Sequence, residues 1–104
     1  MIFARVVGTV VSTQKDPNLH GKKLLLCREV DHAGTPLKSY HVAVDAVEAG
    51  EGNLVLLSYG SAARMTEQTK NAPIDAVILA IVDDVRITAS AEGAPRVAAA
   101  KGAR

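Results

Sequence analysis

The sequence predicts an all-β fold: a small OB-like five-stranded β-barrel with one short helix, assembling with copies of itself. Three observations support this prediction. Short apolar segments alternate with turn signals along the chain. The central stretch, Tyr40–Arg64, contains two such segments rich in Val and Leu, with two glycines between them. Several segments are also apolar on both faces, which a single small barrel does not need.

The size and composition fit one folded domain. The chain has 104 residues, of which 48% are apolar and 22% are charged. The net charge of +1 gives no field that would attract nucleic acid or an anionic membrane. The N-terminus lacks the pattern of a signal peptide, and no apolar run approaches the ~20 residues that span a bilayer. We therefore expect a cytoplasmic protein with neither nucleic acid nor membrane as a partner.

The first half of the chain predicts two strands. Ile2–Thr13 is the first, because its even positions are all small or apolar and form one face. Gly8 in its middle predicts a bend or bulge of the kind that small barrels need at their corners. The polar connection Gln14–Gly21 leads to the second strand, Lys22–Val30. Asp31–Lys38 then contains the Asp, Gly and Pro that are typical of a turn.

The two central strands are predicted at Tyr40–Val47 and Leu54–Tyr59. We expect a tight turn to join them, in which Gly50 and Gly52 supply positive φ angles. Nothing in this stretch resembles a reacting group. The sequence Gly50-Glu51-Gly52 is too short for a phosphate-binding loop and lacks the Lys-Ser/Thr that follows one, so it is interpreted as a turn.

The last part of the fold is predicted to be one short helix and one strand. Ser61 has the chemistry of an N-cap for a helix over Ala62–Thr69. The final strand lies within Ile74–Ile87, where Ala76–Val82 is apolar at seven consecutive positions. The barrel domain is accordingly predicted to span residues 1–87.

Three segments are apolar on both faces: Leu24–Cys27, Leu54–Leu57 and Ala76–Val82. A domain of this size has one core, so something else must cover the second apolar face. Because the chain has few aromatic residues, we expect that cover to be another copy of the chain. The expectation fails if one barrel alone buries the residues that represent these segments. Those residues are Leu25, Leu57 and Val77.

No group of residues predicts catalysis, a metal site or a cofactor. Cys27 lies inside an apolar strand and is interpreted as a small buried hydrophobic residue. The three histidines lack the spacing of a metal motif. Asp83 and Asp84 are adjacent, so on a strand they point to opposite faces and cannot act as an acid–base pair. We therefore expect a protein that is not an enzyme.

A second function remains open, because OB-like barrels also bind single-stranded nucleic acid. Such proteins stack bases on aromatic side chains over a basic groove. This chain has only Phe3, Tyr40 and Tyr59 to offer, and no basic stripe runs along a predicted strand. The nucleic-acid hypothesis therefore ranks second.

Five short motifs occur in the order in which one known family has them. VGTVVSTxK spans residues 7–15, and LxGxKLL spans residues 19–25. AVDAVxAGxG spans residues 43–52, VLL followed by GSAAR ends at residue 64, and PIDA leading to IVD ends at residue 83. Together they run through most of the chain, and they resemble the bacterial microcompartment shell vertex proteins, the EutN/CcmL family.

The resemblance implies a structural role. In this family an OB-like barrel forms a homopentamer, and each pentamer closes one vertex of a polyhedral shell in the bacterial cytoplasm. The facets of that shell are made by a separate family of hexameric proteins. A ring of this kind requires a contact between two different faces of neighbouring subunits. Candidate loops near the five-fold axis are Gly50, Glu51, Gly52, Gly60 and Ser61. Candidate residues at the subunit contact are Asp45, Asp83, Arg64 and Arg5.

Two features depart from the family pattern. Glu48 stands where the family usually has glycine, so the sequence leaves the backbone shape of that loop open. The segment 88–104 is rich in alanine, has a net charge of +2 and lacks the short closing strand common in the family. We expect it to be a flexible tail; docking of a short segment on a neighbour or shell partner is the alternative.

Overall fold

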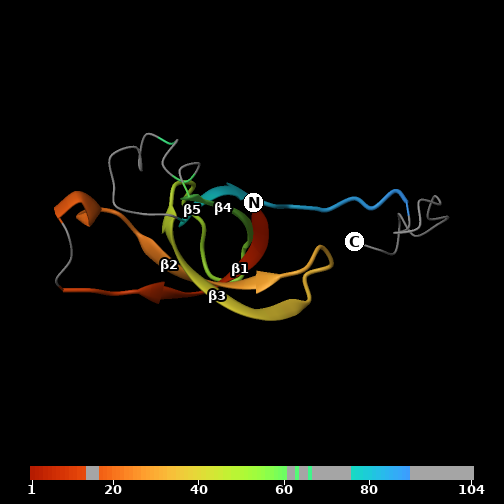
Figure 1. Cartoon of the computed structure of the whole chain (residues 1–104), viewed down its shortest axis with the longest axis horizontal. Coiled ribbons are helices and arrows are strands. Elements are labelled where there is room, and N and C mark those ends of the chain that lie inside the picture. The colour runs from red at the N-terminus through yellow and green to blue at the C-terminus, as the bar shows by residue number, and fades with distance from the viewer. Residues whose placement is uncertain (14–16, 61–62, 64–65, 67–75, 90–104) are drawn as a thin grey trace.

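The computed structural model describes residues 1–13, 17–60, 63, 66 and 76–89. These residues form five strands, which close into a barrel in the order β1-β2-β3-β5-β4 (Figure 1). The predicted all-β, five-stranded barrel is therefore confirmed. The predicted helix over Ala62–Thr69 lies almost wholly outside the described residues, as does its cap, Ser61. The described part of the chain includes the short 3₁₀ helix η1 (Pro17–Leu19), where a polar connection was expected, and Gly60 and Ala63 also have 3₁₀ conformation.

Strand β1 (Ile2–Val10) has different neighbours along its length. Its first residues, Ile2–Arg5, pair with β4, and from Ala4 onward it pairs with β2 (Leu24–Val30). The β1–β2 register shifts between Val6 and Gly8. The bulge predicted from Gly8 is thus confirmed, and it bends the strand at the corner where β1 leaves β4.

Strand β3 (Pro36–Asp45) begins four residues earlier than the sequence predicted. The predicted turn at Asp31–Lys38 is shorter, because proline is tolerated as the first residue of a strand. β3 also does not form a hairpin with β4 (Leu54–Tyr59). Strand β5 (Ala76–Ile81) lies between them, antiparallel to β4 and parallel to β3. The prediction that a tight turn alone joins the two central strands is therefore wrong. A turn is present at Gly50–Asn53, where the amide of Asn53 donates to the carbonyl of Gly50 at 3.1 Å, but it lies within a longer connection, residues 46–53.

The barrel core consists of the side chains that alternate inward along the strands. Leu25 and Leu57 are among its largest buried members. The other buried members are Ala4, Val6, Cys27, Ala43, Ala49, Val55, Ala76 and Ile78.

A second, smaller cluster lies on the opposite face of the sheet. Val44 and Val77 are direct partners across β3 and β5, and both are buried with Ala63. The expectation that another copy must cover the doubly apolar strands is therefore wrong for Leu25, Leu57 and Val77, all of which one chain buries. The connection after β4 contributes Ala63 to the outer face, which the sequence pattern alone did not indicate.

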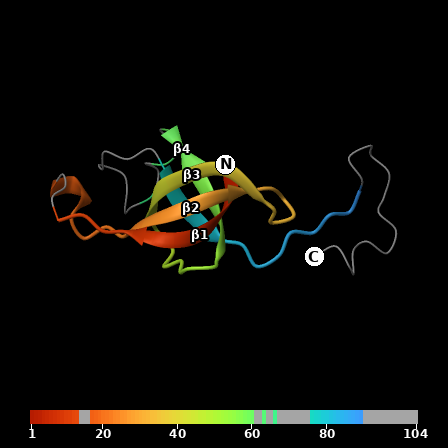
Figure 2. The same cartoon turned by 90° about the horizontal axis from the view of Figure 1, so that it is seen from below.

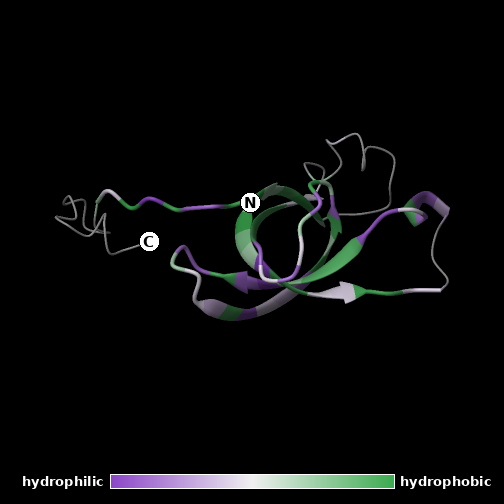
Figure 3. Cartoon of the chain, turned by 180° about the vertical axis from the view of Figure 1, so that it is seen from behind, coloured by the Kyte–Doolittle hydropathy of each residue, from purple (hydrophilic) through white to green (hydrophobic). Residues whose placement is uncertain are grey.

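Figure 3 shows hydrophobic residues along the strands of the barrel. The large apolar side chains that stay exposed lie on and after β1, on the first part of β3, and at Met1, Tyr59 and Ile81. On β3 the exposed apolar residues are Leu37, Tyr40 and Val42. On and after β1 they are Val7 and Val11. Ile81 belongs to a segment that the sequence pattern singled out, Ala76–Val82, whereas the exposed residues on β1 and β3 do not.

After β5 the chain leaves the barrel. The amide of Val82 donates a hydrogen bond to the carbonyl of Leu54 at 2.8 Å, and residues 82–88 belong to no strand. In two perpendicular views this segment leaves from the end of the barrel where the β2–β3 turn projects (Figures 1 and 2). Most of the predicted tail, residues 90–104, lies outside the described residues, and the predicted domain boundary at residue 87 stays a prediction.

Candidate functional site: the loops and the subunit-contact surface

The first candidate axis loop, residues 46–53, is tied to β1 by several hydrogen bonds. The amide of Gly52 donates to the carbonyl of Val6 at 2.8 Å, and the amide of Val6 donates to the carbonyl of Asn53 at 3.0 Å. The guanidinium of Arg5 donates to the carbonyl of Gly52 at 2.8 Å. These bonds hold the loop against the strand, and Gly52 has the positive φ, 87°, that was predicted for it.

Arg5 was predicted to lie at a subunit contact. Its Nη1 donates a hydrogen bond to the carbonyl of Gly52 in the same chain. Its Nη2 lies 3.3 Å from the position that a Cβ on Gly34 would occupy. Arg5 therefore links the loop at residues 46–53 to the turn between β2 and β3. A contact with a neighbouring subunit stays a prediction for this residue.

Asp45 is the second predicted contact residue, and its side chain is only 1% exposed. One carboxylate oxygen accepts a hydrogen bond from the amide of Val47 at 3.0 Å. The other lies 3.8 Å from the Lys23 ammonium, which also donates to the carbonyl of Ala49 at 3.2 Å. A buried carboxylate needs such partners to offset its lost hydration. Asp45 and Lys23 therefore fix the start of the loop.

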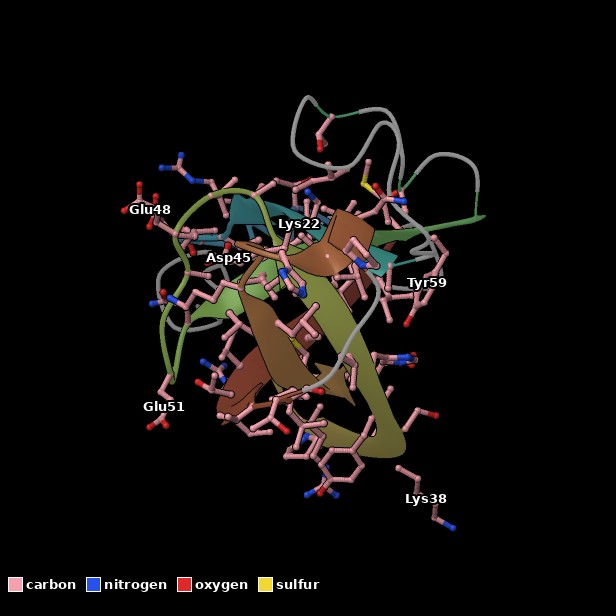
Figure 4. All side chains as sticks on the ribbon, turned by 90° about the vertical axis from the view of Figure 1, so that its left-hand side faces the viewer. Lys22, Lys38, Asp45, Glu48, Glu51 and Tyr59 are labelled. Carbon is pink, nitrogen blue, oxygen red and sulfur yellow. The ribbon has the colours of Figure 1, made fainter. Side chains whose placement is uncertain are left out.

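Glu48 resolves the question that the sequence left open about this loop. Its φ is 59°, so it occupies the left-handed region, and it is the only non-glycine residue of the described chain that does so. Its side chain is exposed and points away from the barrel (Figure 4). The backbone thus keeps the conformation that suits glycine, although the chain has a glutamate there. Gly50, in contrast, has no positive φ, so the predicted positive φ is wrong for this residue.

A pocket of about 260 Å³ lies beside this loop. Both signs of charge line it, including Lys22, Lys23, Asp45 and Glu48. The mixture favours neither an anion nor a cation. Among the described residues, no three His, Cys, Asp or Glu side chains gather as metal ligands, and no helix is long and apolar enough to cross a membrane.

The second candidate axis loop begins at Gly60, whose φ is 65°. It follows the C-terminal end of β4, whereas Gly52 precedes the N-terminal end of that strand. A six-residue strand is about 20 Å long, so the two candidate loops are separate features of the barrel. Figure 4 accordingly shows Glu51 and Tyr59 on different sides of the molecule. Ser61 and Arg64 lie outside the described residues.

The β2–β3 turn at the other end of β3 is held by Asp31. Its carboxylate accepts hydrogen bonds from the amides of Ala33 and Thr35, each at 2.9 Å, and Gly34 has a φ of 88°. These bonds, with that from the Thr35 amide the largest cause, lower the pKa of Asp31 below its ordinary value. Because these hydrogen bonds lie within the turn, they hold its shape where the N-terminal part of β3 projects beyond the barrel.

Arg28 organises the projecting part of β3, a role that the sequence interpretation missed. Its Nε donates to the carbonyl of Leu37 at 2.8 Å, and its guanidinium lies 5.3 Å from the centre of the Tyr40 ring. The signal that could have found this region is the alternation of Lys38, Tyr40 and Val42, which extends the strand pattern back into the predicted turn.

Cys27 lies in the barrel core, as the sequence predicted. Burial, together with the charge of Asp45, raises the pKa of its thiol to about 11. A thiol with so little thiolate is a poor nucleophile. Cys27 therefore behaves as a small hydrophobic residue.

Comparison with known proteins identifies the chain's relatives. Residues 1–83 match the family described as ethanolamine utilisation protein EutN/carboxysome. The bacterial microcompartment shell vertex protein PduN of Salmonella typhimurium is 53% identical over 87 residues, which cover 80% of this chain and 96% of that protein.

Solved structures give the same result. The structure of Gloeobacter violaceus CcmL is similar with a TM-score of 0.80 and 48% identity, covering 84% of this chain and 90% of that one. The GrpN pentameric microcompartment shell protein from Rhodospirillum rubrum has a TM-score of 0.76 and 42% identity, covering 84% of this chain and 99% of that one. The chain therefore belongs to the EutN/CcmL family, which confirms the resemblance found in its sequence.

Proposed function

We propose that this chain is a structural protein whose homopentamer closes the vertices of a bacterial microcompartment shell. The observation that carries the proposal is its likeness to a solved pentameric shell protein over 99% of that protein's length. The match includes the whole barrel, so the surfaces that form a ring in that relative have counterparts here. The relatives are named as shell vertex proteins, and such a role requires shape rather than catalysis.

A ring of five requires two different surfaces on each subunit. Among the exposed large apolar side chains of the described residues, Val7 and Val11 lie on and after β1, and Leu37, Tyr40 and Val42 lie on β3; Met1, Tyr59 and Ile81 are exposed as well. Strand β2 lies between β1 and β3 in the sheet, so the exposed residues of β1 and those of β3 are on opposite sides of it. Two separated apolar surfaces suit a head-to-tail contact better than an isologous dimer.

The candidate residues at the subunit contact fall into two groups, one that can touch a neighbouring subunit directly and one that acts through a loop. Asp83 is exposed and lies in the segment that leaves the barrel after β5, so it is available for a direct contact. Arg5 and Asp45 would act indirectly, since both hold the loop that contains Gly52. For the five-fold axis the alternatives are the loop Gly50, Glu51 and Gly52, or Gly60, because β4 separates them.

The partners that we propose are four further copies of the chain and hexameric facet proteins of the same shell. The corresponding location is the shell of a microcompartment within the bacterial cytoplasm. The nucleic-acid alternative gains no support: the Tyr40 ring lies beside the Arg28 guanidinium, and the Tyr59 ring lies 5.2 Å from the ring of His41, centre to centre. Neither ring forms part of a continuous stacking surface for bases.

The first test is the mass of the full chain in solution. One chain has a mass of 10.9 kDa, so native mass spectrometry and sedimentation at micromolar concentration should report about five times that mass, about 55 kDa. A persistent monomer would overturn the proposal.

The second test is shell closure. Facet proteins from the same source should form open sheets or tubes alone and closed polyhedra when this chain is added, as seen by electron microscopy. A pentamer that leaves the facet assemblies unchanged would argue against the vertex role while keeping the ring. Salt-sensitive binding of single-stranded DNA, lost in the Tyr40→Ala variant, would instead favour the alternative.

A further inference from the structure

Strand β3 has an open edge along most of its length. On one side it pairs with β2 from Pro36 to Val44. On the other side it pairs with β5 only at Val44 and Asp45. From Pro36 to Val42 that second edge has no strand beside it among the described residues. Backbone groups on such an edge are a template for another strand, and natural proteins usually cover or charge it.

The side chains of this edge are better suited to contact than to solvation. Tyr40 is 53% exposed and Val42 is 49% exposed, and Lys38 stands at the outer end of the row (Figure 4). These three residues alternate along the strand and therefore share a face. Apart from Lys38, the row lacks the charges that protect a free edge.

The segment after β5, residues 82–89, which we call the arm, belongs to no strand as far as Thr88, and Ala89 forms a single β-bridge. Its alternate residues differ in character: Asp83, Val85 and Ile87 lie on one side, and Asp84, Arg86 and Thr88 lie on the other. On the polar side the Arg86 guanidinium lies 3.4 Å from the Asp84 carboxylate. The arm thus has the alternation of a strand with one wet face, although its residues 82–88 belong to no strand.

The arm does not cover the open edge of its own chain. It leaves the same end of the barrel as the β2–β3 turn (Figures 1 and 2). The strands that pair with β3 in the described part of the chain are β2 and β5, so the open edge remains available to the arm of a second copy. In a ring, such an exchange gives the same head-to-tail contact at every interface.

The two surfaces match in chemistry over five residues on each side, Lys38–Val42 of β3 and Asp83–Ile87 of the arm. A parallel alignment places Asp83 opposite Lys38, Val85 opposite Tyr40 and Ile87 opposite Val42. One opposite-charge pair and two apolar pairs then share one face, which is the kind of cross-strand pairing that stabilises sheets. The antiparallel alignment would instead place Asp83 opposite Val42 and Ile87 opposite Lys38.

We propose that the arm of one subunit adds as an edge strand to β3 of the next subunit. This inference rests on the proposed pentamer and names the contact that joins its subunits. The main chain supplies the hydrogen bonds of this contact, and the side chains at positions 83, 85 and 87 supply its register, as in other cases of strand addition.

The direct test is photocrosslinking within the full-length assembly. Benzoylphenylalanine replaces Tyr40, and the labelled chain is mixed with unmodified chain grown in ¹⁵N. Mass spectrometry should find crosslinks from position 40 to the peptide containing residues 83–89, with the two peptides carrying different isotopes. The same group at Val11, which is 85% exposed on the far side of β2, is the control and should not reach the arm. Crosslinks to the arm of the same copy, or to other segments only, would overturn the inference.

A second test separates main-chain pairing from side-chain contact. Val85→Pro removes a backbone donor from the arm, and Val85→Ala keeps it. We expect the proline variant to raise the subunit concentration for half-assembly by about tenfold or more, and the alanine variant to raise it clearly less. Equal effects, or none, would overturn the inference. If the wild-type chain is a pentamer but the two variants have equal effects or none, only this inference fails and the proposed function stands. If the wild-type chain is a monomer, the inference and the proposed function both fail.

Discussion

The two ends of strand β3 differ in almost everything that stabilises a strand. At its C-terminal end, Val44 is buried and has β2 on one side and β5 on the other. At its N-terminal end, Leu37 and Tyr40 are exposed, and only β2 lies beside the strand among the described residues. The first end continues into a loop anchored by Asp45, and the second begins at a turn anchored by Asp31.

Within the ten residues of β3, the C-terminal end therefore serves the folding of a single chain, and the N-terminal end is available for assembly with another copy. The C-terminal end closes the barrel, so changes there should act on the stability of one chain. The N-terminal end projects and should tolerate change in a single chain, because exposed substitutions away from special features usually cost little. Any larger cost at that end should appear only when another copy is present. The predictions below test this separation.

The largest difference is expected between two valines of β3 that lie two residues apart. Val44→Ala should lower the unfolding free energy by about 2–3 kcal/mol, because it removes two buried methyl groups and leaves a cavity beside Val77. Val42→Ala, at a half-exposed position, should cost less than about 0.5 kcal/mol in a dissociated chain. Urea unfolding at low subunit concentration measures both. Equal costs would mean that the open edge is already covered within one chain.

A smaller loss is expected at Gly52, in the loop after the embedded end. Gly52→Ala should destabilise the chain by about 1–2 kcal/mol, because the residue has a φ of 87° that an L-residue adopts only with strain. An added Cβ would meet no atom within 4 Å, so steric contact does not contribute. Thermal unfolding checks the loss. Gly50→Ala is the matched control, since Gly50 has no positive φ and should lose less.

The same loop should also permit a gain. Glu48→Gly is expected to raise the unfolding free energy by about 0.5–1 kcal/mol, because the left-handed backbone no longer carries a side chain, although the unfolded chain gains freedom. Glu48→Ala is the control: it removes the charge but keeps the strain, so it should give no such gain. If both variants were equally stabilised, charge rather than backbone strain would be the cause.

The smallest effect is expected at the turn before the open end. The pKa of Asp31 is lowered in the folded chain, so its contribution to stability is present above about pH 4 and disappears as the pH falls through the folded value. Asp31→Ala should therefore be less stable than wild type at pH 7, and the difference should shrink below pH 4 in urea unfolding. Asp31→Asn keeps the acceptor for the amides of Ala33 and Thr35 without the titration. A gap that widens toward low pH would contradict this account.

Much of the fold could be predicted because the relevant signals are local. β4 coincides with its predicted range, and Gly8 marks the bulge that the register confirms. Pairing between strands is not local, and the glycines between β3 and β4 suggested a hairpin that β5 in fact separates. The early start of β3 was missed because Pro36 and Lys38 are residues that a turn and a free edge both favour.

The candidate site was less predictable, because its contacts join distant parts of the sequence. Asp45 was expected at a subunit contact. Within its own chain, its carboxylate accepts a hydrogen bond from the amide of Val47 and lies beside the Lys23 ammonium. The exposed apolar residues could not be chosen from the runs of leucine and valine, because those runs supply both the barrel core and the cluster around Ala63. Which apolar face stays open depends on what the connections cover.

The position of Cys27 has a practical consequence for studying the assembled ring. The chain has a single thiol, which lies inside the barrel with its pKa raised to about 11. An alkylating reagent can therefore reach it at an appreciable rate only when a barrel opens. The rate of labelling would therefore measure how often individual subunits open, and it can be measured on the native sequence without any added probe.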